Sequence, residues 1–198
     1  ITKHGPKADI DWAGNWGMAA SAEAKDYVHL VAAGLAAKGG AAPETMVKNI
    51  ADFERAHVGY DIPGKLREAL EFKADLIVVA IGENVPALKT PAEEASFQDS
   101  VTKLLAAVNG GRQPVLLVRS CFWKNVPNDQ ALRKACAAVG GTFRIRTASR
   151  APISTPSSSV GVQTSVLSCS PAPLNWFSIR SRTACGTCAE CSATRSIE

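Results

Sequence analysis

One apolar run constrains the fold of this chain more than any other segment. Residues 76–81 are six consecutive apolar residues, followed directly by Gly82, Glu83 and Asn84. Such a run, bounded by charge and glycine, is typical of a buried parallel strand whose carboxyl end opens into a loop. Ligands of open α/β sheets bind just outside those carboxyl ends. The candidate site is therefore the 82–84 loop, where the Asn84 amide is suited to donate to a developing oxyanion.

Helices and strands alternate on either side of this run. Apolar spacing and end signals predict helices over residues 22–38, 43–56, 62–73, 90–109 and 128–139. The 90–109 helix has the clearest start, because Thr90 and Pro91 precede two glutamates. Further strands are expected over residues 114–120 and 141–145. This order predicts an α/β fold with a parallel sheet wrapped on both faces.

Composition narrows the possible partners. The 198 residues and 46% apolar content suit one globular domain with a sizeable core. A balance of 22 basic against 18 acidic residues, without a basic block, argues against a nucleic-acid partner. No run approaches the roughly 18 apolar residues of a membrane span, so we expect no membrane partner. The start lacks signal-peptide features and an initiating Met, so residues are expected ahead of Ile1 and the compartment stays open.

The character of the chain changes after residue 146. Residues 147–198 contain no Lys, Asp or His, and 18 of these 52 residues are Ser or Thr. A segment of this kind buries little apolar surface per residue. We therefore expect an α/β domain over residues 1–146 and a tail over residues 147–198 that is poorly ordered or an out-of-frame continuation.

Four of the six cysteines lie in this tail. Cys185, Cys188 and Cys191 are spaced by two residues, and Cys169 lies upstream. Repeated Cys-x-x-Cys spacing lets thiolates reach one zinc or cluster iron. No histidine is nearby, and accidental spacing is the preferred interpretation. A metal-binding or redox module is the competing hypothesis, and we expect neither metal nor cofactor.

Three short motifs at the start and in the middle of the first domain resemble those of the SGNH/GDSL hydrolases. Ile1-Thr2 are similar to the last two residues of a Gly-Asn-Ser-Ile-Thr nucleophile motif, so the resemblance implies a serine just ahead of residue 1. Residues 14–21, GNWGMAAS, resemble the glycine-rich second block, which supplies a backbone N–H to the oxyanion hole. This match places Gly17 in the block and Ala20, where many relatives have glycine, at the donor position.

The third and fifth blocks of the family match less completely. Residues 82–85 resemble Gly-x-Asn-Asp, with Asn84 as the side-chain donor and Val85 in place of the usual aspartate. The fifth block, Asp-x-x-His, has no counterpart, because His4, His29 and His57 all precede the main strand. The resemblance therefore implies an oxyanion hole of Asn84, Ala20 and Gly17 without a recognisable base.

The family implies a three-layer, flavodoxin-like sandwich with a five-stranded parallel sheet. It also implies a serine esterase acting on an acylated carbohydrate or another small ester. Since acyl transfer needs a nucleophile, a base and oxyanion donors, we expect residues 1–198 alone to be inactive or nearly so. A missing first strand would leave buried backbone groups of its neighbours unpaired, at about 1–3 kcal/mol each, and the chain marginally stable. A non-catalytic ligand-binding domain is the alternative.

Several single residues have ordinary structural explanations. We expect His29 to be a packed or half-exposed helical residue, and a substitute base at His57 is disfavoured. The tryptophans Trp12, Trp16 and Trp123 are expected to be core and rim aromatics rather than a substrate cleft. Glu83 is assigned no role.

Overall fold

The computed structural model describes residues 4–17 and 20–145, and the backbone of residues 176–180. Its helical segments are η1 (Ala8–Ile10), η2 (Glu23–Lys25), α1 (Tyr27–Gly39), α2 (Ala51–Arg55), α3 (Ile62–Lys65), α4 (Arg67–Glu71), α5 (Pro91–Asn109) and α6 (Val126–Ala138). Its strands are β1 (Glu44–Lys48), β2 (Leu76–Val79), β3 (Val115–Arg119), β4 (Thr142–Arg144) and β5 (Trp176–Arg180). The predicted α/β class is confirmed.

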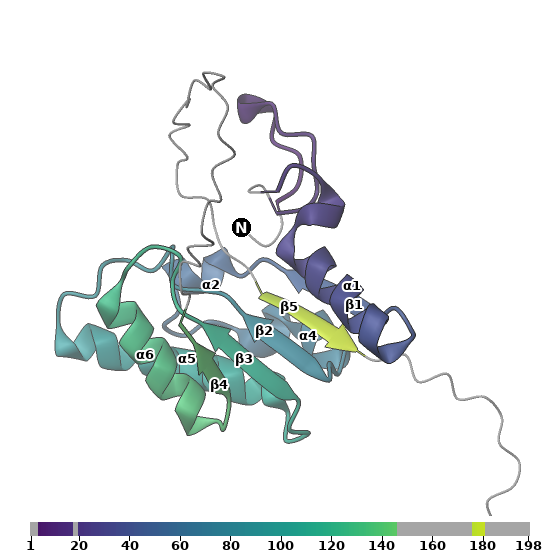
Figure 1. Ribbon diagram of the computed structural model, residues 1–198. Helices are drawn as coiled ribbons and strands as arrows, with labels where there is room; N and C mark the ends of the chain where they lie inside the picture. Colours follow the sequence, from purple (N-terminus) through teal and green to yellow (C-terminus); the bar gives the residue numbers. More distant parts are fainter. Residues whose placement is uncertain (1–3, 18–19, 146–175, 181–198) are drawn as a thin grey trace, which may run out of the picture.

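The strands form one sheet in the order β1-β5-β2-β3-β4 (Figure 1). The pairs β2–β3 and β3–β4 are parallel, whereas β5 is antiparallel to both β1 and β2. It follows that β1, β2, β3 and β4 all run in the same direction. Their carboxyl ends therefore meet at one edge of the sheet, and the loops after these strands are brought together there.

The main core lies on one face of the sheet. Ile77 and Val79 of β2 and Leu116 and Val118 of β3 alternate along their strands and are all buried. These residues pack with α5 and α6, which lie side by side (Figure 1). The other face of β2 is half-buried and packs against α1 around Val28.

Several elements follow the sequence expectations closely. The predicted strands at 75–81, 114–120 and 141–145 are β2, β3 and β4, and the helices at 90–109 and 128–139 are α5 and α6. The helix predicted over 22–38 is α1, which begins five residues later than predicted, at Tyr27, because Asp26 caps it and residues 23–25 form η2. The start of α5 is fixed by a capping box, in which Glu93 N–H donates to Thr90 Oγ1 and Thr90 N–H donates to Glu93 Oε2. Local chemistry is sufficient to specify these elements.

The helix predicted over residues 43–56 is wrong in its first half. Residues 44–48 form strand β1, and only residues 51–55 form helix α2. The helix was predicted because Met46, Ile50 and Phe53 are spaced three or four residues apart, as on one face of a helix. Met46 lies opposite Ser178 of β5. Pairing with a distant strand overrides a weak local preference. The helix expected over 62–73 is likewise split into α3 and α4.

Within the tail that the sequence predicts to be poorly ordered, the backbone of residues 176–180 forms a strand. These residues form β5, whose aromatic and β-branched side chains favour a strand. Leu76, Ile77 and Val78 of β2 lie opposite residues 177–179, so this edge of β2 is paired rather than left open. Within the described residues, β2 therefore has a partner strand on both sides, β3 and β5. The rest of the tail lies outside the described residues.

None of the helices within the described ranges combines the length and the apolar character that crossing a bilayer requires.

Candidate functional site

The loop after β2 lies at the edge of the sheet where the carboxyl ends of β2 and β3 meet. Gly82 adopts φ 120°, a conformation that favours glycine. A Cβ atom at this position would lie 2.5 Å from Cys121 Sγ, which follows β3. Glycine therefore allows the two loops to approach closely and sets the direction in which Glu83 and Asn84 leave the strand.

A buried carboxylate organises this loop. Glu54, on α2, is 0% exposed. Its Oε1 accepts the backbone N–H groups of Gly82 at 2.5 Å and Asn84 at 3.3 Å. Its Oε2 accepts the side-chain amide of Asn84 at 2.6 Å. Because α2 follows β1 at the same edge of the sheet, Glu54 can reach a loop that is 30 residues further along the chain.

The environment of Glu54 has opposing effects on its charge. Burial raises the pKa of the Glu54 carboxyl above its ordinary value, and the N–H donors from Gly82 and Asn84 offset only part of that effect. Burying a carboxylate costs free energy unless it is hydrogen-bonded, and the N–H donors of Gly82 and Asn84 supply these bonds. Glu54 therefore fixes the conformation of the loop rather than forming a surface ion pair.

The Asn84 side chain is held from two sides. Its Nδ2 donates to Glu54, and its Oδ1 accepts from Arg55 Nη2 at 3.5 Å. Together these partners define which end of the amide is oxygen and which is nitrogen. One Asn84 N–H is used by Glu54, and the second has no partner among the described residues. The amide therefore keeps one donor available.

Glu83 has a structural contact. Its Oε1 accepts the backbone N–H of Phe122, which joins the β2 loop to the loop after β3. Asn128 of α6 adds a second tie, because its Nδ2 donates to the Gly82 carbonyl at 2.8 Å. The backbone N–H of Cys121 donates to Asp129 at 2.7 Å. The loops after β2 and β3 thus form one connected network with the start of α6.

Gly17 and Ala20, the other predicted oxyanion donors, already have partners. The Gly17 N–H donates to the buried Asp26 carboxylate at 3.2 Å, and the Ala20 N–H donates to the Gly17 carbonyl at 2.8 Å. Asp26 also caps α1, where it accepts from the His29 backbone. No hydrogen bond among the described residues joins this segment to the Asn84 loop.

Sequence reasoning missed Glu54 and Arg55 as partners of the Asn84 loop. Both lie in the 43–56 segment that was interpreted as a helix with mixed charged and apolar residues. Burial of Glu54 is the decisive property, and glutamate is rarely fully buried. No local pattern distinguishes it from a solvated helical glutamate, so only the neighbouring loop reveals it.

The histidines occupy separate places. His29 lies half-exposed on α1, with Nδ1 at 2.7 Å from Asp26 Oδ1, in agreement with the expectation. His57 follows α2, and its Nδ1 lies 3.0 Å from Ser100 Oγ on α5. His4 Nδ1 lies 2.6 Å from the Gly5 carbonyl oxygen, and the His4 backbone pairs with that of Trp16. None of the three has a hydrogen bond to the Asn84 loop.

The three tryptophans lie outside the buried core: Trp12 and Trp16 are partly exposed, and Trp123 is exposed. Trp12 and Trp16 pack edge to face with ring centroids 5.1 Å apart. Trp123 is 61% exposed and packs edge to face on Phe122. Trp16 borders a small cavity of 170 Å³ beside Asp26 and His29.

Metal ligation finds no support in the part of the chain that the structure describes. No group of three His, Cys, Asp or Glu side chains there could hold an ion. The two cysteines placed there, Cys121 and Cys136, are free and buried, and burial raises the pKa of both thiols. The cluster of Cys185, Cys188 and Cys191 lies outside the described residues.

Comparison with known proteins returned no relative of this chain: no family model, no curated protein and no solved structure matches it.

His57 is expected to titrate below the ordinary histidine value of 6.5, because burial between α2 and α5 lowers the pKa of its ring. The folded state then binds this proton less readily than the unfolded state. Its contribution to stability is present above pH 6.5 and is lost as the pH falls from 6.5 through the folded pKa. NMR titration of the His57 ring measures the midpoint, and a midpoint above 6.5 would contradict the expectation.

Proposed function

We propose that this chain carries an ester hydrolase domain of the SGNH/GDSL type, in which the Asn84 amide donates a hydrogen bond to the oxyanion. The observation that supports this most is the amide held between Glu54 and Arg55 with one N–H left over. A donor that is fixed before the reaction does not reorganise in the transition state. The proposed substrates are esters of a carbohydrate or another small alcohol with a small acyl group.

The same proposal includes a specific architecture, a three-layer, flavodoxin-like sandwich. The common direction of β1, β2, β3 and β4 supports it, as does the packing of α1 against one face and α5 with α6 against the other. Strand β5 departs from the all-parallel pattern, because it runs antiparallel between β1 and β2.

The catalytic groups of the proposal come from the resemblance alone. The resemblance implies a serine directly ahead of Ile1. The histidine that serves as the base in the family has no counterpart among the three histidines of this chain. Without a base, an oxyanion donor gives only residual catalysis. Residues 1–198 alone are therefore expected to turn over esters slowly or not at all.

Hydrolysis of para-nitrophenyl acetate tests the proposal. The comparison uses residues 1–198, the same chain preceded by Gly-Asn-Ser, and the preceded chain carrying Asn84→Ala. Because the preceded chain still has no recognisable base, we expect it to release para-nitrophenol slowly but above buffer, and Asn84→Ala to return the rate to that of residues 1–198. Loss of one oxyanion donor costs about 10²–10³-fold in an intact enzyme.

A matched variant separates the role of Asn84 from a loss of folding. Asn109→Ala removes an asparagine at the end of α5, far along the chain from the loop, and should leave the rate unchanged. Equal rates for the preceded chain with and without Asn84→Ala would overturn the oxyanion role.

A non-catalytic ligand-binding domain is the second candidate. The observation that favours it is that the N–H groups of Gly17 and Ala20 are used internally, which leaves Asn84 as the one predicted donor with a free N–H. Saturable binding of an ester without release of product, in the chain preceded by Gly-Asn-Ser, would favour this candidate over hydrolysis.

A further inference from the structure

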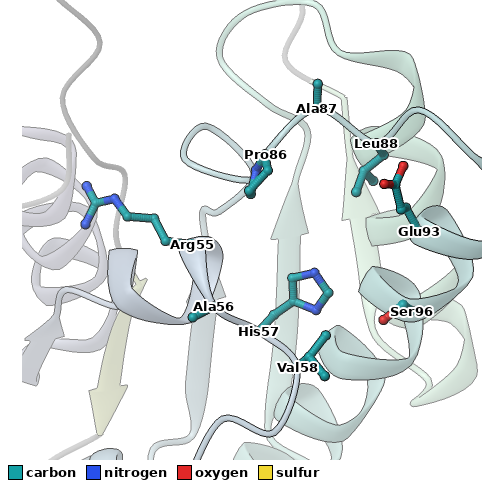
Figure 2. Close-up of a pocket in the computed structure, with 9 residues that line it drawn as sticks. All are labelled: Arg55, Ala56, His57, Val58, Pro86, Ala87, Leu88, Glu93 and Ser96. Carbon is teal, nitrogen blue, oxygen red and sulfur yellow. The ribbon is translucent and has the colours of Figure 1, made fainter.

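A pocket that Asn84 does not line lies between the end of α2, the loop before α5, and α5 itself (Figure 2). Its volume is about 420 Å³, within the range of small-molecule sites. Residues 55–58 line one side, residues 86–88 line another, and Glu93 and Ser96 of α5 complete it. Much of this wall is apolar, contributed by Val58, Pro86 and Leu88.

The His57 ring is held in one orientation at this pocket. Its Nδ1 lies 3.0 Å from Ser100 Oγ, and the ring packs edge to face on Phe97 with centroids 5.3 Å apart. The Ser100 hydroxyl donates its single proton to the Ser96 carbonyl at 3.0 Å. Both contacts can form together only if His57 Nδ1 carries the ring proton.

The second ring nitrogen is therefore an acceptor. With Nδ1 protonated, the neutral ring has an unshared electron pair at Nε2. Among the described residues, Nε2 has no hydrogen-bond partner. Figure 2 shows the ring extending between the 86–88 loop and α5, toward Ser96 and Leu88. An acceptor beside an apolar wall selects a ligand that brings a hydrogen-bond donor.

The charged residues of the pocket disfavour an anion. The Glu93 carboxylate lies beside Leu88 in Figure 2, and its Oε2 accepts the backbone N–H groups of Lys89 and Thr90. The Arg55 side chain extends away from His57 and lies near Asn84 Oδ1. The positive group is therefore turned away from the pocket, whereas a negative group borders it.

We propose that this pocket binds a small neutral molecule with an apolar body and one hydroxyl group, such as an alkylphenol, and that the hydroxyl donates to His57 Nε2. The proposal does not rest on ester hydrolysis: neither Asn84 nor Glu54 lines the pocket, and the one residue shared with the Asn84 site, Arg55, has no part in the hydrogen bond to the ligand. It assigns His57 a binding role.

A ligand pair tests the hydrogen bond in the unaltered chain. Isotope-labelled protein at pH 8 is titrated with 4-ethylphenol and, separately, with 4-ethylanisole, the methyl ether that cannot donate. We expect saturable shifts of the His57 ring and of the 87–88 backbone amides with the phenol, and affinity at least about 10-fold weaker for the ether. A third titration with 4-ethylbenzoate, an anion of similar size, tests the preference for a neutral ligand. Equal affinities for the phenol and the ether, tighter binding of the benzoate, or no saturable shift with the phenol would each overturn the proposal.

Variants add a second measurement. His57→Phe keeps a ring between the neighbouring aromatic residues but removes the acceptor, so it should bind the phenol and the ether equally. His29→Phe, on α1 and outside the pocket, is the matched control and should keep the preference for the phenol. A retained preference in His57→Phe would overturn the role of Nε2. If that variant does not fold, the ligand pair in the unaltered chain still decides.

Discussion

Replacing Glu54 with alanine should lower the free energy of unfolding by about 3 kcal/mol or more. The substitution leaves three donors without their acceptor: the N–H groups of Gly82 and Asn84 and the Asn84 amide. Each buried unsatisfied group costs about 1–3 kcal/mol. Part of this loss is offset, because removing the carboxyl also removes the desolvation penalty of burying it, the same effect that raises the pKa of Glu54. Urea unfolding followed by circular dichroism measures the difference.

A matched substitution distinguishes this network from general loss of a glutamate. Glu71→Ala, on the exposed side of α4, should change stability by less than about 0.5 kcal/mol. Glu54→Gln keeps one carbonyl acceptor in place and should fall between the two. A Glu54→Ala variant as stable as Glu71→Ala would show that the loop does not depend on the buried carboxyl.

Gly82→Ala is the second substitution with a large expected effect, about 3 kcal/mol of lost stability. Two costs combine at this position. A side chain at φ 120° is strained, at about 1–3 kcal/mol. The new Cβ also meets Cys121 Sγ at 2.5 Å, so one loop has to shift. The shift moves Asn84 relative to Glu54, and we expect the Asn84 amide signals to change in NMR spectra.

A double-mutant cycle separates the two costs. Cys121→Ala removes the sulfur atom, so Gly82→Ala should cost less in that background than in the unaltered chain. Gly111→Ala is the matched control for backbone strain, because Gly111 has φ 70° and open space around its Cα. It should lose about 1 kcal/mol. Identical losses for Gly82→Ala in both backgrounds would rule out the contact with Cys121.

One part of the candidate site could be predicted from neighbouring residues in the sequence, and another part could not. The 82–84 loop was predictable, because an apolar run ending in glycine specifies a strand and the residues just beyond it. The role of Glu54 was not predictable, because a glutamate in an isolated helix of this sequence would be exposed to solvent. The difference arises from the sheet: β1 and β2 end at the same edge, and α2 follows β1 there.

Three elements were predictable because their signals lie within a few neighbouring residues: β2 with its glycine, β3, and α5 with its capping box. In contrast, residues 44–48 are a strand because they pair across the sheet with residues 176–180, which are distant in the chain. Backbone hydrogen bonds between strands more than 100 residues apart leave no periodic trace in either segment. Burial of Glu54 has the same origin, since it depends on which loops the sheet brings together.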